Sequence, residues 1–345
     1  MPSAHEVYSA IVGRKWLIIA IALAVLFVLF ILDMTTGVAN ISFFDVIKTL
    51  IYPDSVTAGM RSIVWDTRLP VALIAIGAGL ALGAAGSQMQ TILDNPLADP
   101  YTLGISSAAA FGAGMAIALG IGISELGAYM LPVNAFVFAL LSCGVIYGVA
   151  RKKSSDKTVI VLTGIAMMFL FQALVALMQY MGNAQQASSI LFWMFGSLYR
   201  ATLGDVMILF VVFAVMFAFF MLSSWKLTSL KLGDAKATSL GVDVPKLRRN
   251  ILICVSLLTA TAVSFTGTIG FIGLVGPHIA RMLVGDDQRY FLPLSAIIGA
   301  LLLSAASILC KIIAPGTIFP IGIITSLIGI PFFMMLVLKK KDVVF

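Results

Sequence analysis

Long apolar runs, each about as long as a helix that crosses a bilayer, constrain this chain more than any other feature of its sequence. Hydrophobic residues make up 61% of its 345 residues, and charged residues only 11%. An average soluble domain has about 25% charged residues, whereas about 17–25 apolar residues can cross a bilayer as a helix. The sequence predicts an all-α membrane protein with about ten transmembrane helices, at 16–32, 68–91, 102–121, 130–150, 158–181, 205–223, 248–267, 270–284, 290–312 and 321–338.

The basic residues predict the orientation of these helices. If the N-terminus lies in the cytoplasm, 17 of the 22 lysines and arginines fall on the cytoplasmic side. Cytoplasmic loops of membrane proteins are enriched in lysine and arginine. We therefore expect both termini in the cytoplasm, and we interpret the first apolar run as an uncleaved span. This distribution explains the net charge of +7 without a nucleic-acid partner.

Residues 1–345 are predicted to form a single transmembrane domain with two notable connecting segments. The outer loop, 33–67, contains apolar residues at helical spacing, which indicates a short helix lying on the membrane surface. The inner segment, about 231–247, contains Asp234 as a candidate N-cap, Gly241 as a candidate helix end and Asp243 before a second helix. We expect short cytoplasmic helices here, which would be either an ordinary connector or a docking site for a cytoplasmic partner.

Several function classes find no support in the sequence. It contains no GxxxxGK[ST] motif for nucleotide phosphates. No acidic residue falls in the middle of a predicted span, where ion-coupled transporters place ionisable groups. The three cysteines lie far apart in apolar runs, and there are only two histidines. We therefore expect no metal site, no cofactor bound by this chain and no enzymatic activity.

Polar residues gather where the second predicted span ends on the cytoplasmic side. The span has a small-residue stretch, 77–90, which favours close helix packing. The turn that follows, 93–104, reads LDNPLADPYTLG, and its prolines and aspartates predict a rigid structure. We interpret these residues, with two serines of the next inner loop, as candidates for the inner end of a translocation path: Gln88, Gln90, Asn95, Pro96, Asp99, Pro100, Ser154 and Ser155.

Ordered motifs over most of the chain resemble one family of transport proteins. The stretch NPLADPYTLGISSAAAFGA follows the second predicted span, and LGDAKATSLGVDV lies in the inner segment. GTIGFIGLVGPHIARMLVGDDQRYFLP and FPIGIITSLIGIPFF follow in the same order as in the family. The chain resembles the FecCD-type permeases for iron-siderophores, haem and vitamin B12, which are the membrane subunits of ATP-binding-cassette importers.

The resemblance implies a set of partners and roles. Two copies of the chain would form the pore, two ATPase subunits would bind ATP and Mg on the cytoplasmic side, and an extracytoplasmic protein would deliver a metal chelate. The chain would lie in the inner membrane of a prokaryote, in contact with lipid and not with nucleic acid. Arg61 and Arg68 would dock the binding protein. The residues coupled to the ATPase would be Gly233, Asp234, Ala235, Ser239, Leu240 and Gly241.

Two departures from the family pattern lie on the predicted outer face. Val71 replaces the second arginine of the RLPR motif, and Ile318 stands in the region where a glutamate is usual. Permeases for iron-siderophores, haem and corrinoids share these motifs. Iron-siderophore is the first substrate candidate because iron chelates are the broadest class in the family, with haem and corrinoids next. A secondary transporter that works without an ATPase is the alternative.

Overall fold

The protein is helical throughout the part of the chain that its computed structural model describes, namely residues 3–39, 41–120, 127, 129–153 and 155–339. Within these residues seven helical stretches are long and apolar enough to cross a membrane. They are α1 (Ala4–Thr35), a continuous run over 58–93 that includes α4 (Leu69–Leu93), α6 (Met130–Lys152), α7 (Lys157–Met181), α9 (Leu203–Leu222), α12 (Val244–Thr266) and α14 (Gln288–Ile313).

Three further helices are apolar but shorter than these seven stretches: α5 (Ile105–Leu119), α13 (Ile272–Val284) and α15, which spans Ile321–Lys339 and is apolar over Ile321–Met335. The predicted all-α membrane fold is confirmed. The number of ten spans and the cytoplasmic position of both termini stay predictions. The second predicted span, 68–91, is longer than expected because helical structure starts at Ala58 and continues through a π-helix, Ile63–Arg68.

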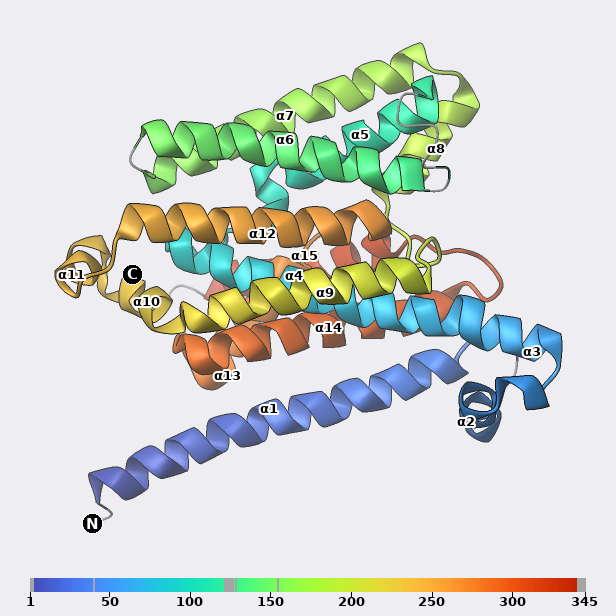
Figure 1. Ribbon diagram of the computed structural model, residues 1–345, viewed down its shortest axis with the longest axis horizontal. Helices are drawn as coiled ribbons and strands as arrows, with labels where there is room; N and C mark the ends of the chain where they lie inside the picture. The colour runs from blue at the N-terminus through green and yellow to red at the C-terminus, as the bar shows by residue number, and fades with distance from the viewer. Residues whose placement is uncertain (1–2, 40, 121–126, 128, 154, 340–345) are drawn as a thin grey trace.

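Short helices occupy the connecting segments. At one end of the molecule are α2 (Phe43–Ile51), α3 (Ala58–Ser62) and α8 (Ala184–Met194), and at the opposite end are α10 (Ser224–Ser229) and α11 (Asp234–Ser239) (Figure 1). The helix predicted in segment 33–67 is observed as α2, while its position on the outer membrane surface stays a prediction. Four short turns of helix complete the described elements: Pro53–Ser55, the π-helix, Pro100–Leu103 and Leu230–Leu232.

The long helices pack around α4. In Figure 1, α12, α9 and α14 surround α4, while α5, α6 and α7 form a layer on one side and α1 runs along the other. Of the 25 residues of α4, 21 are buried, whereas α1 is exposed along much of its length. An apolar helix exposed in this way fits a lipid environment.

Glycines allow α4 to approach its neighbours closely. A Cβ added at Gly79 or Gly83 would collide with the backbone of α14, and one at Gly86 would collide with the carbonyl of Gly273 at the start of α13. Side chains larger than hydrogen would push these helices apart. The small-residue stretch of the sequence therefore serves tight helix packing, as predicted.

Three breaks in the helical structure meet inside the fold. They lie after α8, between α12 and α13, and before α15. The amide of Ser197 donates to the carbonyl of Thr266 at 2.7 Å, and the amide of Gly322 donates to the carbonyl of Phe195 at 2.9 Å. These bonds satisfy backbone groups that the interrupted helices leave without partners.

The inner segment matches its predicted local structure except at one cap. Gly241, with φ +85°, follows α11, and the Asp243 side chain caps α12 by accepting from the amide of Lys246. The prediction that Asp234 is an N-cap is wrong. Gly233 holds that position, and Asp234 is the first residue of α11 because its carboxylate binds Arg248 instead.

Candidate functional site

A cavity of about 730 Å³, here called the inner cavity, lies beside the meeting point of the three helix breaks. Its walls come from the turn at 97–102, the end of α8, the residues before and at the start of α13, and one face of α15. Most of the lining side chains are apolar, among them Leu191, Phe271 and Phe333. The cavity is large enough for a small molecule with an apolar surface.

Asp99 is the one acidic residue in the described lining of the inner cavity. Its Oδ1 accepts from the amide of Tyr101 at 3.0 Å and so caps the short helix Pro100–Leu103. This confirms that Asp99 bonds a nearby backbone amide. Burial raises the pKa of the Asp99 carboxyl to about 6, and the hydrogen bond from Tyr101 opposes that rise.

The turn that carries Asp99 lies alongside α13. A Cβ at Gly273 would stand 3.0 Å from Asp99 Oδ1 and 3.2 Å from the carbonyl oxygen of Leu82. Asp99 therefore approaches α4 at a level well before the last residue of that helix, Leu93. The segment 94–104 folds back towards the centre of the molecule.

Gln90 compensates for a proline in α13. Pro277 has no amide hydrogen, so the carbonyl of Gly273 lacks the usual helical donor. The Gln90 side-chain amide lies 3.5 Å from that carbonyl and 3.4 Å from the carbonyl of Leu274. Its Oε1 accepts from Arg281 at 3.1 Å, so Gln90 joins α4 to α13 at two points.

Gln88 is also buried within the helix packing. Its amide donates to Gln288 Oε1 at 3.0 Å, and the Gln288 amide donates in turn to Thr91. Neither Gln88 nor Gln90 lines the inner cavity. Their part in an inner gate stays a prediction, and the structure places them as links between α4 and the helices beside it.

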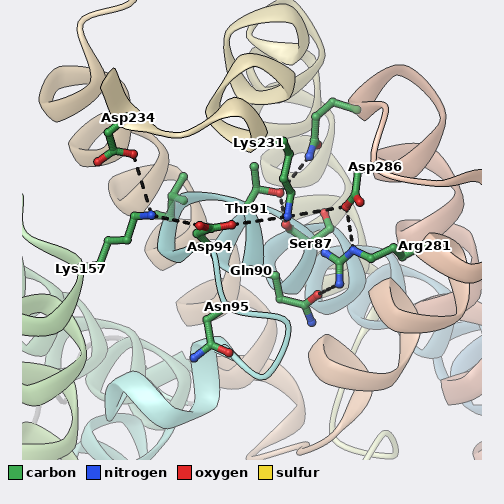
Figure 2. Close-up of polar contacts among 12 residues, drawn as sticks. Ser87, Gln90, Thr91, Asp94, Asn95, Lys157, Lys231, Asp234, Arg281 and Asp286 are labelled. Atoms are coloured by element: carbon green, nitrogen blue, oxygen red, sulfur yellow. Dashed lines mark hydrogen bonds and ion pairs between the residues drawn. The ribbon is translucent and has the colours of Figure 1, made fainter. Parts of the chain in front are cut away.

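A chain of alternating charges connects α11 to α13 at the end of the molecule that carries α10 and α11 (Figure 2). Lys157 lies 3.9 Å from Asp234 and 3.3 Å from Asp94. Lys231 continues the chain at 3.9 Å from Asp94 and 3.6 Å from Asp286. Arg281 closes it at 2.8 Å from Asp286. Below, these residues are called the ion-pair chain.

Arg248 fixes α11 to the body of the protein. Its side chain is 4% exposed and donates to the carbonyls of Ile92 and Ser155 at 2.8 and 3.0 Å. The same guanidinium binds both carboxylate oxygens of Asp234 at 3.0 and 3.1 Å. One buried arginine thus joins α12, the end of α4, the loop before α7 and the first residue of α11.

The remaining face of α11 and the two residues that follow it are open. Ala235, Ser239, Leu240 and Gly241 are exposed, while Ala237 is buried. Leu240 is 51% exposed although it is apolar. Four of the six residues predicted to couple to an ATPase are therefore accessible, while Gly233 and Asp234 are half-buried and Asp234 anchors α11 from beneath.

The other predicted inner-path residues lie in the connecting turns. Asn95 is exposed and accepts from the amide of Leu97, and Pro96 lies beside it. Pro100 starts the short helix that Asp99 caps. Ser155 is buried, with φ +58°, and its hydroxyl donates to the carbonyl of Pro245. Ser154 lies outside the described residues.

A second, smaller pocket of about 300 Å³ lies at the opposite end of the molecule and is lined by Arg68, Tyr199 and Lys311, among others. The Arg68 guanidinium donates to the carbonyls of Met34 and Thr35 at 2.7 and 3.1 Å, and to that of Ala39. Arg68 thus satisfies carbonyl groups at the C-terminal end of α1. Arg61, in contrast, is exposed and pairs with Asp54 at 2.8 Å.

Sequence reasoning missed a buried ion pair beside this pocket. Asp33 and Lys311 lie 2.9 Å apart with side chains only 1% and 5% exposed, and the Ser307 hydroxyl donates to Asp33 at 2.9 Å. Because α1 and α14 are far apart in sequence, no local pattern pairs these residues. A charged residue at the end of an otherwise apolar run was the one available signal.

The fold and the site together define a class: a helical membrane protein with an apolar cavity beside interrupted helices and an accessible helix at one end, as in transport proteins. Among the described residues no group of three His, Cys, Asp or Glu side chains could hold a metal ion. The absence of a metal or cofactor in this chain stays a prediction.

The chain belongs to the FecCD transport family, whose model matches residues 25–339. It is 39% identical over 285 residues to an ABC transporter permease protein of Methanocaldococcus jannaschii, covering 80% of this chain and 82% of the relative. It is 34% identical over 310 residues to the hemin transport system permease protein HmuU of Yersinia pestis, covering 90% of this chain and 93% of the relative. The resemblance found in the sequence is thereby confirmed.

A solved structure supports the same assignment. A metal-chelate type ABC transporter in an inward-facing conformation matches with a TM-score of 0.82 and 28% identity, over 93% of this chain and 99% of that one. The relatives are transporter permease subunits, and the chain is a membrane permease of this family.

Proposed function

We propose that this chain is the permease subunit of a binding-protein-dependent ABC importer for a metal chelate. The observation that carries the proposal is the pairing of an apolar central cavity with an anchored, accessible α11 in a chain of this family. Two copies would form the pore in a prokaryotic inner membrane. Two ATPase subunits would supply ATP and Mg, and an extracytoplasmic protein would deliver the chelate.

Coupling would start at α11. The exposed face of that helix would lie in a groove of the ATPase, while Arg248 links the same helix to the end of α4. The ion-pair chain extends this link to α13 and to the turn that holds Asp94. Closure of the ATPase dimer would then move the inner ends of these helices together.

Relatives carry different chelates. Named substrates among them include iron chelatin, hemin and cobalamin. An iron-siderophore is the first candidate here, and haem or a corrinoid the next. On the outer face, Arg61 is accessible for a binding protein, and Arg68 would contribute through the smaller pocket that it lines.

The coupling proposal is tested by a change on the exposed face of α11. We expect Leu240→Asp to prevent retention of the ATPase subunit on the purified permease, because a charge replaces an apolar contact. Tyr52→Asp changes a similarly exposed residue at the opposite end and serves as the control. Full retention of the ATPase by Leu240→Asp would refute the assignment of α11.

The secondary-transporter alternative gains one specific observation, the buried Asp33–Lys311 pair, since intramembrane ionisable pairs occur in proton and ion pathways. Uptake in proteoliposomes separates the two functions. The proposed importer requires ATP and the ATPase subunit. Uptake driven by an ion gradient in their absence would establish the alternative.

A further inference from the structure

The wall of the inner cavity carries a single charge. Among its described lining residues Asp99 is charged, four side chains carry hydroxyl groups, and the others are apolar or glycine. No lysine, arginine or histidine lies in that lining. A molecule in the cavity would therefore meet an apolar surface with one carboxylate.

The Asp99 carboxylate is held in place without a cation. Its position is set by the hydrogen bond from the Tyr101 amide and by the close approach of Gly273. None of the ion pairs described in the structure includes Asp99. Asp94, five residues earlier in the same turn, pairs with both Lys157 and Lys231 outside the cavity. The two aspartates of the turn therefore have different electrostatic roles.

We propose that the inner cavity accepts chelates without net negative charge and that Asp99 is the specificity-determining residue for this selection. The inference rests on the proposed function, because it concerns the substrate of the same path. The class of substrate is a metal complex with a largely apolar shell and a neutral or cationic surface.

The physical basis is the low polarity of the cavity wall. Charges interact more strongly beside apolar groups than in water, since the effective dielectric constant is lower. A polyanionic complex would lose its hydration and meet a negative carboxylate without a compensating positive group. A complex with an ammonium or another hydrogen-bond donor would instead gain a charge-assisted bond to Asp99.

Asp99 also has a structural role, and the choice of variant separates the two roles. Asparagine can still accept the Tyr101 amide hydrogen as a cap, but it carries no charge. Asp99→Asn therefore tests selection with the turn preserved. Asp94→Asn removes a carboxylate from the same turn outside the cavity and is the matched control.

The test measures binding of two probes to the full chain in detergent or nanodiscs without ATPase subunits. The probes are the cationic ferric complex of a linear trihydroxamate amine and the trianionic ferric tris-catecholate complex. We expect the wild type to bind the cationic complex more than 10-fold more tightly. Asp99→Asn should reduce this preference by about 10-fold, and Asp94→Asn should leave it unchanged, since loss of one charge interaction is of this size.

A second variant keeps the test independent of the turn. Ser326 lies on α15 in the cavity wall, so Ser326→Lys adds a positive charge there and should move the preference towards the tris-catecholate complex. Equal binding of the two probes by the wild type, no binding of either, or an unchanged preference in both cavity variants would overturn the proposal. The proposed function has a separate test. If the wild type prefers the cationic complex but shows no ATP-dependent uptake together with the ATPase subunits, the proposed function alone is refuted.

Discussion

At the scale of single residues, Arg248 forms hydrogen bonds to three separate segments of the chain, which no sequence pattern predicted. Removal of its guanidinium leaves two carbonyls and the Asp234 carboxylate without their donors. Leaving a buried acceptor unsatisfied costs about 1–3 kcal/mol. We expect Arg248→Ala to destabilise the fold by about 2–4 kcal/mol, measured by thermal unfolding in detergent. Lys246→Ala, an exposed change in the same helix, should stay within about 0.5 kcal/mol.

The raised pKa of Asp99 predicts a pH dependence of stability. Its folded pKa of about 6 lies above the ordinary value of 3.8, so the folded state binds the proton more tightly than the unfolded state. The contribution of Asp99 to wild-type stability should therefore decrease as pH rises from about 4 to about 6, by at most about 3 kcal/mol. Tyr101, the neighbouring titratable group, has a raised pKa and stays protonated in this range.

The Asp99→Asn variant has no carboxyl group at this position, so comparison with the wild type isolates the effect of Asp99 protonation on stability. The stability of the variant relative to the wild type should be greater at pH 7.5 than at pH 4, since asparagine resembles the protonated acid. Melting temperatures of both proteins across this range provide the measurement. Parallel pH profiles of the two proteins would contradict the prediction.

At the scale of helices, the glycines of α4 set how closely the membrane helices approach. Gly86→Ala places a methyl group against the backbone of α13, and we expect a destabilisation of about 1–3 kcal/mol. Gly148 on α6 has open space around its Cα, so Gly148→Ala should be neutral or stabilising by about 0.5–1 kcal/mol. Thermal unfolding of the two variants compares the sites directly, and equal effects would argue against the close α4–α13 contact.

Local signals predicted the elements well because they depend on nearby residues. Gly241 and Asp243 end and begin helices where the sequence indicated, since a left-handed φ and a side-chain cap need only a few neighbours. Asp234 was assigned the wrong role because Arg248, fourteen residues later, captures its carboxylate. The partner of Gln90 also depends on how α13 packs, which no spacing within the sequence specifies.

In the candidate site, too, local motifs were predictable from the sequence, whereas contacts between distant segments were not. Motifs identified the turn around Asp99 and the segment around α11, whereas the cavity needs the turn, α8, α13 and α15 to meet in space. The contacts of Arg68 depend on the fold for the same reason, since its guanidinium binds the carbonyls at the end of α1, and its part in docking stays a prediction. Sequence reasoning thus located the important segments, and the fold decided which side chains face the cavity.

At the scale of the whole molecule, the two ends should be accessible from opposite sides of the membrane. Leu240 directly follows α11, and Asp54 lies between α2 and α3, which are at the opposite end of the structure (Figure 1); both residues are exposed. In intact cells a membrane-impermeant thiol reagent should label Asp54→Cys and not Leu240→Cys, because we expect α11 to be cytoplasmic. The native protein, with its three cysteines, gives the background. Labelling of Leu240→Cys from outside would reverse the predicted orientation.

The buried pair of Asp33 and Lys311 has a consequence for biosynthesis. During translation α1 enters the membrane first, whereas α14 is made almost three hundred residues later. Until then the Asp33 carboxylate has no lysine beside it and is best accommodated near the interfacial water, which its position two residues before the end of α1 permits. Pairing of α1 with α14 would therefore occur only after α14 is made, and a nascent protein truncated before α14 would retain an uncompensated charge that membrane quality control would recognise.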